Sequence, residues 1–527
     1  MALALRTKDP FRTVHVGALA LCAVFLPWSE AFLSIAQMVL VANWIAEGIV
    51  RHDLKARFKQ AFTSWPSLVF LSFFGLHLLG LIWTTNLGWG WDLVRILLPV
   101  LSFGAVLAAS PRLTAKEYRT ILLLSAWAAV TCFLFGALFS KGAPGDYRAL
   151  SMFISHIRLA LLLCLAVVVF LTFKGSRPWI TVLHWIAALW AVYAINALGS
   201  IQGLVVLALI AWTMGWRRTR TMASATRWSI RLALVLLPIA GLASIVHQAK
   251  GAQRPIPQGL GKRTEWTAGG SAYAHDTTNT QTENGTHVWT YIAWDELRRA
   301  WQHRTGRSID GMDGKGHVLW STAIRYMASK GLLKDSVGVM ALSDMDIAAI
   351  QQGATNVDHG TRSRTQQRID EVLFELDLYR TKGIVSGHSV TMRLEFLKTG
   401  WAIAKEHWAY GVGTGDTQAA FDAQYAAIKS PLEDRWRLRA HNEYLTLWIS
   451  FGVLSLCWSL FTWWWPAYRL GAWQQPLFIA WAIAFAISCL TDDTIETQPG
   501  ATFFALYYAL FVFAAPKRPV EGAPLSD

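Results

Sequence analysis

Charged residues are scarce in this chain. Asp, Glu, Lys and Arg make up 16% of its 527 residues, whereas a soluble domain carries about 25%. The charges are also uneven in sign, with a formal net charge of +14. So few charges in so long a chain argue against an ordinary soluble globular protein.

Cysteine is equally sparse. The five cysteines all fall inside apolar runs, and no pair has the spacing of a metal site or predicts a disulfide framework. No metal-ligand cluster stands out elsewhere in the sequence. No cleavage-site pattern follows the first apolar run, so we expect that run to stay in the protein as a helix.

What the chain has in abundance is long apolar runs, such as residues 152–173. About twenty apolar residues cross a bilayer as a helix. The 28 tryptophans often stand at segment ends, as expected for residues at lipid headgroups. We therefore predict an all-α polytopic membrane protein with about twelve transmembrane helices. The predicted spans lie near residues 13–28, 31–49, 66–84, 92–109, 119–140, 152–173, 178–197, 200–214, 229–247, 442–465, 473–490 and 500–515.

The connectors between these runs alternate in charge. Every even connector and both ends carry basic residues, among them Arg6, Lys8, Lys517 and Arg518, and the short odd connectors are poor in Lys and Arg. Basic connectors lie on the cytoplasmic side. The pattern places both termini inside and residues 248–441 outside. Since topology explains the positive charge, we expect membrane lipids and no nucleic acid as partners.

The predicted organisation has three parts. Residues 1–247 form nine transmembrane helices, residues 248–441 a large outer loop, and residues 442–527 three more helices and a cytoplasmic tail. The loop begins as a flexible polar stretch and then shows helical periodicity. We expect a mainly helical soluble domain. Its predicted helices lie near residues 289–306, 317–331, 344–353, 362–381 and 389–408.

Residues suited to catalysis or anion binding cluster at the end of this loop. Arg393 begins a periodic helix, three alternating glycines follow in Gly411–Gly415, and His441 opens the HNEYL motif at the mouth of the tenth span. A neutral imidazole takes a proton from a hydroxyl near neutral pH. The alternating glycines suit either a close approach of backbone N–H groups to an anion or simply a tight turn.

This combination resembles the O-antigen ligase family, which also includes O-antigen polymerases and some protein O-oligosaccharyltransferases. The matching residues are Arg393, Trp401, the Gly411–Gly415 turn, HNEYL from His441, and Gly452. The resemblance implies transfer of a glycan from an undecaprenyl diphosphate carrier to a hydroxyl of the lipid A core. It also implies a bacterial inner-membrane enzyme whose site faces the periplasm, with neither a metal nor another cofactor.

Roles follow from that reaction. His441 is the candidate general base. Arg393 and Arg158 are the candidates for binding the diphosphate, because guanidinium groups bind phosphate oxygens bidentately. Direct displacement predicts inversion at the anomeric carbon. Each residue also has a simpler interpretation as an interfacial or solvated side chain, and Arg158 could reach the headgroups alone.

Further candidates for substrate binding surround this set. Asp492, in the last outer connector, could orient His441, bind sugar hydroxyls or face solvent. Many relatives carry an arginine where this chain has Gln202, which supplies no positive charge. Arg158 or Arg95 could replace it, or diphosphate binding could rest on Arg393 and a basic strip at residues 435–439. The remaining candidates are Arg435, Arg437, Arg439, Gly413, Gly415 and Asn442.

Two alternatives to a ligase stay open. The same chemistry serves a polymerase or a protein O-oligosaccharyltransferase with a different acceptor. A transporter or flippase also commonly has twelve spans, but such proteins often show internal repeats, which the sequence lacks, and transport needs no loop as long as residues 248–441.

Overall fold

The computed structural model describes residues 9–140, 147–252, 265–276, 279, 281–360, 372, 375–376, 379–380, 383 and 385–516. The chain folds into two compact units, residues 1–231 with 382–527, and residues 232–381. Four predicted cytoplasmic basic residues and most of the predicted helix 362–381 lie outside the described residues. The four basic residues are Arg6, Lys8, Lys517 and Arg518.

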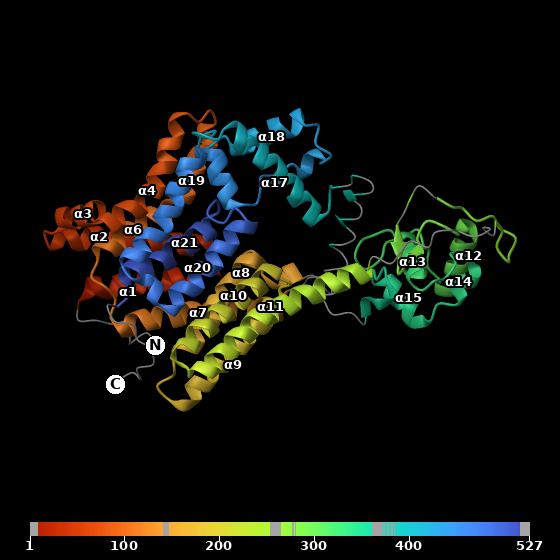
Figure 1. Ribbon diagram of the computed structural model, residues 1–527, viewed down its shortest axis with the longest axis horizontal. Helices are drawn as coiled ribbons and strands as arrows, with labels where there is room; N and C mark the ends of the chain where they lie inside the picture. The colour runs from red at the N-terminus through yellow and green to blue at the C-terminus, as the bar shows by residue number, and fades with distance from the viewer. Residues whose placement is uncertain are drawn as a thin grey trace. The chain divides into compact units, whose positions relative to one another are not determined.

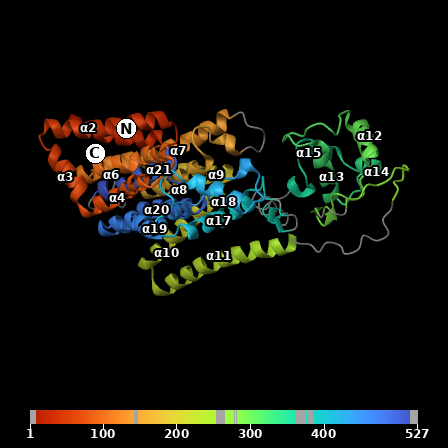
Figure 2. The ribbon, with the colours of Figure 1, turned by 90° about the horizontal axis from the view of Figure 1, so that it is seen from above.

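The first unit is built from helices that pack side by side (Figures 1 and 2). Its elements are α1 Pro10–Phe25, α2 Glu30–Val50, α3 Leu54–Thr63, α4 Trp65–Leu79, η2 Gly80–Ile82, α5 Leu87–Ile96, α6 Leu98–Ala109, α7 Ala115–Phe139, η3 Tyr147–Leu150, α8 His156–Thr172, α9 Pro178–Ala197, α10 Ile201–Arg218, η4 Thr219–Thr221, the start of α11 Ser224–Ala252, α17 Ser389–Glu406, α18 Thr417–Ala427, η6 Asp434–Trp436, α19 Glu443–Arg469, η7 Ala472–Gln474, α20 Pro476–Thr491, α21 Gln498–Ala509 and the π-helix η8 Leu510–Ala514.

A helix occupies each of the twelve predicted apolar segments. Within the described residues, six helical stretches are long and apolar enough to cross a membrane, and four shorter helices are also apolar. The protein is therefore an all-α membrane protein. The count of twelve spans stays a prediction. The six long stretches are Glu30–Val50, Trp65–Ile82, Leu87–Ala109, Ala115–Phe139, Pro178–Ala197 and Glu443–Arg469.

Local sequence signals explain where several helices begin. Thr114 precedes α7 and forms a capping box, in which its hydroxyl accepts from the Glu117 N–H and the Glu117 carboxylate accepts from the Thr114 N–H. This arrangement satisfies two backbone donors that the helix leaves free. Prolines stand in the first turns of α9 and α20, where a missing N–H costs nothing.

The basic connectors meet one another at one end of the first unit. Arg12 forms a 2.6 Å ion pair with Glu117, and Arg112 Nη1 donates to the Ala515 carbonyl at 3.0 Å. These contacts join connectors that the charge pattern assigns to the same side. A further contact of this set runs from Arg217 to the carbonyl of Gln474.

The predicted outer connectors also contact one another. Asp416 accepts from the Thr85 N–H at 2.7 Å, and Asp492 lies within ion-pair distance of both Arg158 and His441. Helices α17 and α18 pack beside the start of α19 (Figure 1). The contacts fit the predicted alternation of connectors, whereas the side of the membrane that each set faces stays a prediction.

The second unit, described by itself, is a small domain with its own core. It contains the rest of α11, β1 Thr282–Glu283, β2 Thr286–His287, α12 Trp294–Thr305, α13 Leu319–Ser329, α14 Ser336–Met340, α15 Asp344–Gln351 and η5 Val357–Gly360. The strands pair antiparallel, with Thr282 opposite His287. Trp301, Ile324 and Met327 are fully buried between the helices. Helices α12, α13 and α15 lie within the predicted segments 289–306, 317–331 and 344–353, whereas the sequence does not predict the short helix α14.

A buried lysine stands in this core. Lys334 is 1% exposed, and its Nζ donates to the carbonyls of His287 at 2.8 Å and Thr290 at 3.1 Å. Burial lowers the pKa of Lys334 to about 8, because removing a charge from water favours the neutral amine. The ammonium therefore fixes the turn after β2 at an energetic cost.

Candidate functional site

The HNEYL motif fixes the start of α19. Asn442 caps the helix, since its Oδ1 accepts from the Leu445 N–H at 3.0 Å, and its Nδ2 donates to the Leu490 carbonyl at 3.0 Å. Glu443 is 2% exposed and accepts from the Ile495 N–H at 2.9 Å. These bonds hold the connector between α20 and α21 against the start of α19.

The last two residues of the motif anchor the same helix to its neighbours. The Tyr444 hydroxyl donates to the Ala486 carbonyl of α20 at 3.0 Å. On the other side, a Cβ added to Gly400 of α17 would lie 2.8 Å from Leu445 Cδ2. The absence of a Cβ at Gly400 thus gives the Leu445 side chain room against α17.

His441 adopts an unusual backbone conformation. Its φ of 47° is left-handed, which costs a non-glycine residue about 1–2 kcal/mol. Its side chain is 35% exposed, and its ring lies 5.8 Å from the Phe396 ring of α17, centroid to centroid. A strained residue held by its surroundings is common at active sites, and this one projects an accessible imidazole beside α17.

Two carboxylates face the same ring nitrogen of His441. Nδ1 lies 3.7 Å from Asp492 Oδ1 and 3.9 Å from Asp493 Oδ2. These distances exceed a hydrogen bond but allow electrostatic stabilisation of a protonated ring. The Thr446 hydroxyl donates to Asp493 at 2.9 Å and holds it in place. Within the described residues no hydrogen bond involves Nε2, which leaves that atom available to a substrate.

Asp492 also faces a guanidinium group. Its Oδ2 lies 3.4 Å from Nη2 of Arg158, at the start of α8. Burial raises the pKa of Asp492, but the His441 imidazole and the charge of Arg158 outweigh it, so the pKa of Asp492 lies below its ordinary value. Asp492 is therefore ionised near neutral pH and connects the imidazole to the guanidinium.

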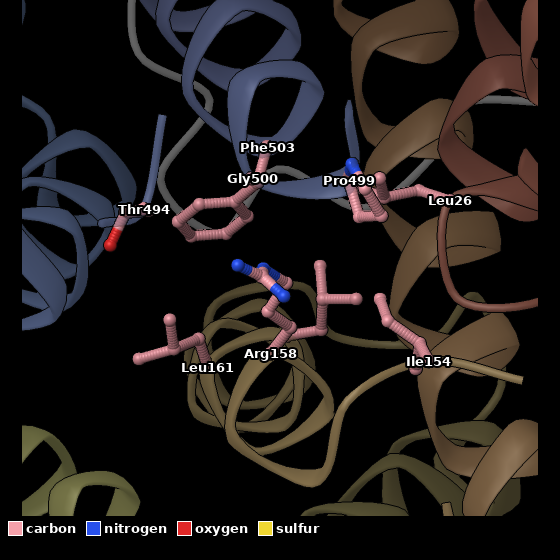
Figure 3. A pocket seen from close by; sticks show the side chains of 9 residues that line it. Leu26, Ile154, Arg158, Leu161, Thr494, Pro499, Gly500 and Phe503 are labelled. Carbon is pink, nitrogen blue, oxygen red and sulfur yellow. The ribbon is translucent and has the colours of Figure 1, made fainter. Parts of the chain in front are cut away.

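Arg158 lines a pocket among the helices. Its guanidinium points into the space between Phe503 of α21 and the first turn of α8 (Figure 3). The pocket is small, with room for about one water molecule, and is otherwise lined mainly by apolar residues, such as Leu26 and Ile154. Within the described residues, the buried Nε of Arg158 has no hydrogen-bond partner. The pocket therefore places a cationic group beside apolar side chains.

The turn around Gln202 lies next to the same helix. A Cβ added to Gly203 would lie 2.9 Å from Ala160 Cβ, two residues beyond Arg158. Gln202 Nε2 is buried without a hydrogen-bond partner among the described residues. Arg95, the other possible substitute for the absent arginine, is 74% exposed and pairs with Asp92 on α5. Because residues two apart point to opposite sides of a helix, this contact does not place the Arg158 guanidinium beside Gln202.

Arg393 stands on the exposed part of α17. It precedes Phe396 by one helical turn, which places it towards the helix face that contacts His441. The described residues offer it no ion pair, and no contact joins it to His441 or Arg158. The structure thus brings His441, Asp492 and Arg158 together, but it does not bring Arg393 into contact with them.

The three arginines before His441 are each paired with an acid. Arg435 pairs with Glu433 at 2.9 Å, and Arg437 with Asp434 at 2.7 Å. Arg439 pairs with Glu496. Their charges are therefore compensated in the folded protein, and they form no free basic strip.

The Gly411–Gly415 turn uses its backbone N–H groups within the protein. Gly413 N–H donates to the Ser450 carbonyl at 2.9 Å, and Gly415 N–H to the Thr84 hydroxyl at 3.1 Å. Groups already bonded in this way are not free to bind an anion. The geometry favours the second of the two alternatives, a structural turn, for Gly413 and Gly415.

This turn packs into a break in α19. Gly452 inside the helix has φ 81° and ψ 171°, and a Cβ there would lie 2.1 Å from the Ala409 carbonyl oxygen. A Cβ at Gly411 would lie 2.3 Å from the Ser450 carbonyl carbon. The Val453 N–H donates to Trp408 at 2.8 Å. The turn thus satisfies backbone groups that the break would leave bare in a membrane.

Some residues of the site carry no signal in the sequence. Trp89 on α5 lies against Arg439, and Glu496 pairs with that arginine from the connector after α20. Each looks like an ordinary residue of an outer connector, and only the tertiary structure brings them together. No group of three or more His, Cys, Asp or Glu side chains in the described part of the chain is arranged to hold a metal.

Comparison with known proteins agrees with the location of this site. The model of the O-antigen ligase family matches residues 372–460. This segment contains Arg393, the Gly411–Gly415 turn, His441 and Gly452. No curated protein matches the chain. Residues 372–460 thus match the O-antigen ligase family, which supports the resemblance predicted from the sequence.

Proposed function

We propose that this protein transfers a glycan from undecaprenyl diphosphate to a hydroxyl of the lipid A core, with His441 as the general base. One observation carries the proposal: Asp492 lies between the imidazole of His441 and the guanidinium of Arg158. The reaction needs a base that takes the proton of the acceptor hydroxyl and a cation that binds the leaving diphosphate. His441 and Arg158 stand at the two ends of this arrangement.

The proposed step is a single displacement at the anomeric carbon. The acceptor oxygen forms a bond to that carbon while its proton passes to His441 Nε2. The bond from the anomeric carbon to the phosphate oxygen breaks, and its electron pair leaves with the diphosphate. Asp492 stabilises the imidazolium that forms. The configuration at the anomeric carbon inverts.

Arg158 suits the leaving group for two reasons. A guanidinium stabilises phosphate charge through several N–H donors, and the unpartnered Nε of Arg158 has donor capacity to offer. Arg393 is proposed as a second phosphate-binding group, because within the described residues it lies exposed on α17 without an ion pair.

The proposed location is the bacterial inner membrane, with the site facing the periplasm. The positive charge of the even connectors supports this orientation. Cysteine labelling with a membrane-impermeant reagent tests it in a protein without native cysteines. We expect Ala426→Cys on α18 to react in intact spheroplasts and Lys59→Cys on α3 to react only after lysis. The reverse pattern would place the site in the cytoplasm.

Glycan transfer by the purified protein tests the function. The assay combines reconstituted protein, a carrier-linked glycan and lipopolysaccharide that lacks O-antigen, with and without a chelator. We expect a glycan-bearing lipopolysaccharide product in both conditions. Transfer only to another carrier-linked glycan would identify a polymerase instead, and transfer only to Ser or Thr a protein glycosyltransferase. No transfer to any acceptor would refute the proposal.

The lipopolysaccharide of a deletion strain separates the same alternatives in cells. Loss of a ligase leaves bare core and accumulates polymeric glycan on the carrier. Loss of a polymerase leaves core that carries a single repeat. We expect the first pattern, and the second would assign the polymerase reaction.

A further inference from the structure

A buried ion pair lies close to His441 in the sequence and the fold. Arg439 precedes His441 by two residues and pairs with Glu496, which follows Asp492 by four. The side chains of Arg439 and Glu496 are only 18% and 10% exposed. The same two chain segments therefore form both the His441–Asp492 pair and the Arg439–Glu496 pair.

An aromatic side chain covers this ion pair. The guanidinium carbon of Arg439 lies 5.7 Å from the centre of the Trp89 ring, a distance typical of a cation–π contact. Trp89 is nevertheless 41% exposed, so a large part of its indole remains open to a ligand. Trp89 thus combines contact with the ion pair and an accessible aromatic surface.

The position of Trp89 is fixed by the fold. Its backbone N–H donates to Oδ1 of Asn86, the N-cap of α5, at 3.1 Å. The Asn86 N–H in turn donates to Asp416 at 2.8 Å. Asp416 follows the glycine turn that packs into the break of α19. The backbone of Trp89 is therefore fixed by hydrogen bonds that connect α5 to the segment after the glycine turn, as expected of a preorganised binding surface.

The chemistry of the group favours a sugar over a phosphate. The Glu496 carboxylate already compensates the charge of Arg439, and it would repel an approaching phosphate. A neutral sugar instead presents hydroxyls that donate to a carboxylate and accept from a guanidinium. The C–H face of its ring packs on an aromatic surface such as the exposed part of Trp89.

We propose that Trp89, Arg439 and Glu496 form a subsite that binds a saccharide ring of the acceptor. This inference rests on the proposed function. In a direct displacement the acceptor enters from the side of the base and the diphosphate leaves on the opposite side. Arg439 belongs to the segment that carries His441, whereas Arg158 comes from α8 on the other side of Asp492. The subsite thus lies with the base.

Steady-state transfer by the full-length reconstituted protein tests the subsite. The variants are Trp89→Ala, Trp89→Phe and Glu496→Gln, and the acceptor is a lipid-free core oligosaccharide. We expect Trp89→Ala to raise the KM for the acceptor about tenfold, which is the effect of losing one favourable contact. The kcat and the KM for the donor stay within about threefold of wild type, and Trp89→Phe recovers most of the affinity. Glu496→Gln raises the same KM.

Trp91→Ala is the matched control. Trp91 lies two residues further along α5 and is 57% exposed, and the described structure shows it in no cation–π contact. We expect its kinetics to equal those of wild type. An unchanged acceptor KM in Trp89→Ala would overturn the inference, as would a rise in the donor KM alone. An effect seen only with a lipid-bearing acceptor would also overturn it, because Trp89 would then anchor the protein at the lipid interface.

A binding measurement separates this inference from the proposed function. Calorimetry measures binding of the lipid-free oligosaccharide to His441→Asn protein, with and without Trp89→Ala. Binding that Trp89→Ala weakens supports the subsite, even if wild type transfers no glycan and the proposed function fails. Equal binding by both proteins, together with active wild type, refutes the subsite and leaves the proposed function standing.

Discussion

Nδ1 of His441 lies 3.7 Å from Oδ1 of Asp492. The two residues are far apart in the sequence and meet because HNEYL binds the connector after α20. The other oxygen of Asp492 faces Arg158. A single carboxylate thus faces both His441, the proposed base, and Arg158, the residue proposed to bind the diphosphate.

Replacing Asp492 tests this coupling. Asp492→Asn keeps the shape of the side chain but removes the charge that stabilises a protonated His441. We expect kcat for glycan transfer to fall about 10²-fold, within the range for general-base catalysis, with little change in the donor KM. Asp295→Asn is the control, since Asp295 is 87% exposed on α12. Wild-type kcat in Asp492→Asn would show that this carboxylate has no part in the reaction.

Arg158 and Arg95 can be separated by the same assay. Arg158→Ala removes the guanidinium beside the apolar pocket, and we expect affinity for the carrier-linked donor to fall about 10- to 100-fold, the effect of losing charged hydrogen bonds. Arg158→Lys should retain part of it. Arg95→Ala should bind the donor normally, because Arg95 is exposed on α5. The opposite ranking would identify Arg95 as the substitute for the arginine absent at Gln202.

The interlocked glycines predict a large effect on stability. Gly411→Ala would hold an alanine in the left-handed backbone conformation. It would also press the new Cβ against the backbone of Ser450. We expect a loss of more than about 2 kcal/mol, measured as a lower thermal unfolding midpoint of the reconstituted protein. Gly17→Ala on α1 is the control, because its added Cβ meets nothing within 4 Å. Equal midpoints for the two variants would contradict the packing.

Lys334 predicts that the second unit becomes more stable at higher pH. The unfolded chain keeps the lysine proton up to about pH 10.5, while the folded protein releases it above a pKa of about 8. Because the unfolded state binds more protons in this window, stability rises with pH. From pH 8 to 9.5 the expected gain is about 2 kcal/mol.

The readout is the urea midpoint for proteolytic cleavage within residues 265–360 of the full-length protein. Lys334→Met should remove the increase between pH 8 and pH 9.5. An equal increase in wild type and Lys334→Met would assign the pH dependence to another group.

Sequence patterns predict the helices well where composition alone decides. Each long apolar run forms a helix, because only such a run can satisfy its backbone within lipid. The amphipathic α3 Leu54–Thr63 escapes prediction because it is short and rich in Lys and Arg. The sequence also predicts that a helix begins near residue 289, but α12 begins at Trp294. Ile292 instead forms an antiparallel β-bridge with Ala274. Contacts distant in sequence set these details.

In the candidate site, too, features that are local in sequence could be predicted, whereas contacts between distant segments could not. The family resemblance could be predicted and His441 proposed, because the HNEYL motif and the glycine turn are local in sequence. The contact of Asp492 with His441 is one of three alternatives that the sequence leaves open, whereas its contact with Arg158 could not be derived, because α8 and the connector after α20 meet only in the folded protein. For the same reason the compensation of Arg439 by Glu496, and its contact with Trp89, escape sequence reasoning.

The single-turnover rate of glycan transfer by His441→Asn protein tests the central claim most directly. Asparagine tolerates the left-handed backbone at this position better than most residues but cannot accept the proton. With carrier-linked donor already bound, we expect transfer to fall by about 10²- to 10⁴-fold while donor binding and the thermal midpoint stay at wild-type values. Transfer at the wild-type rate would show that His441 is not the base.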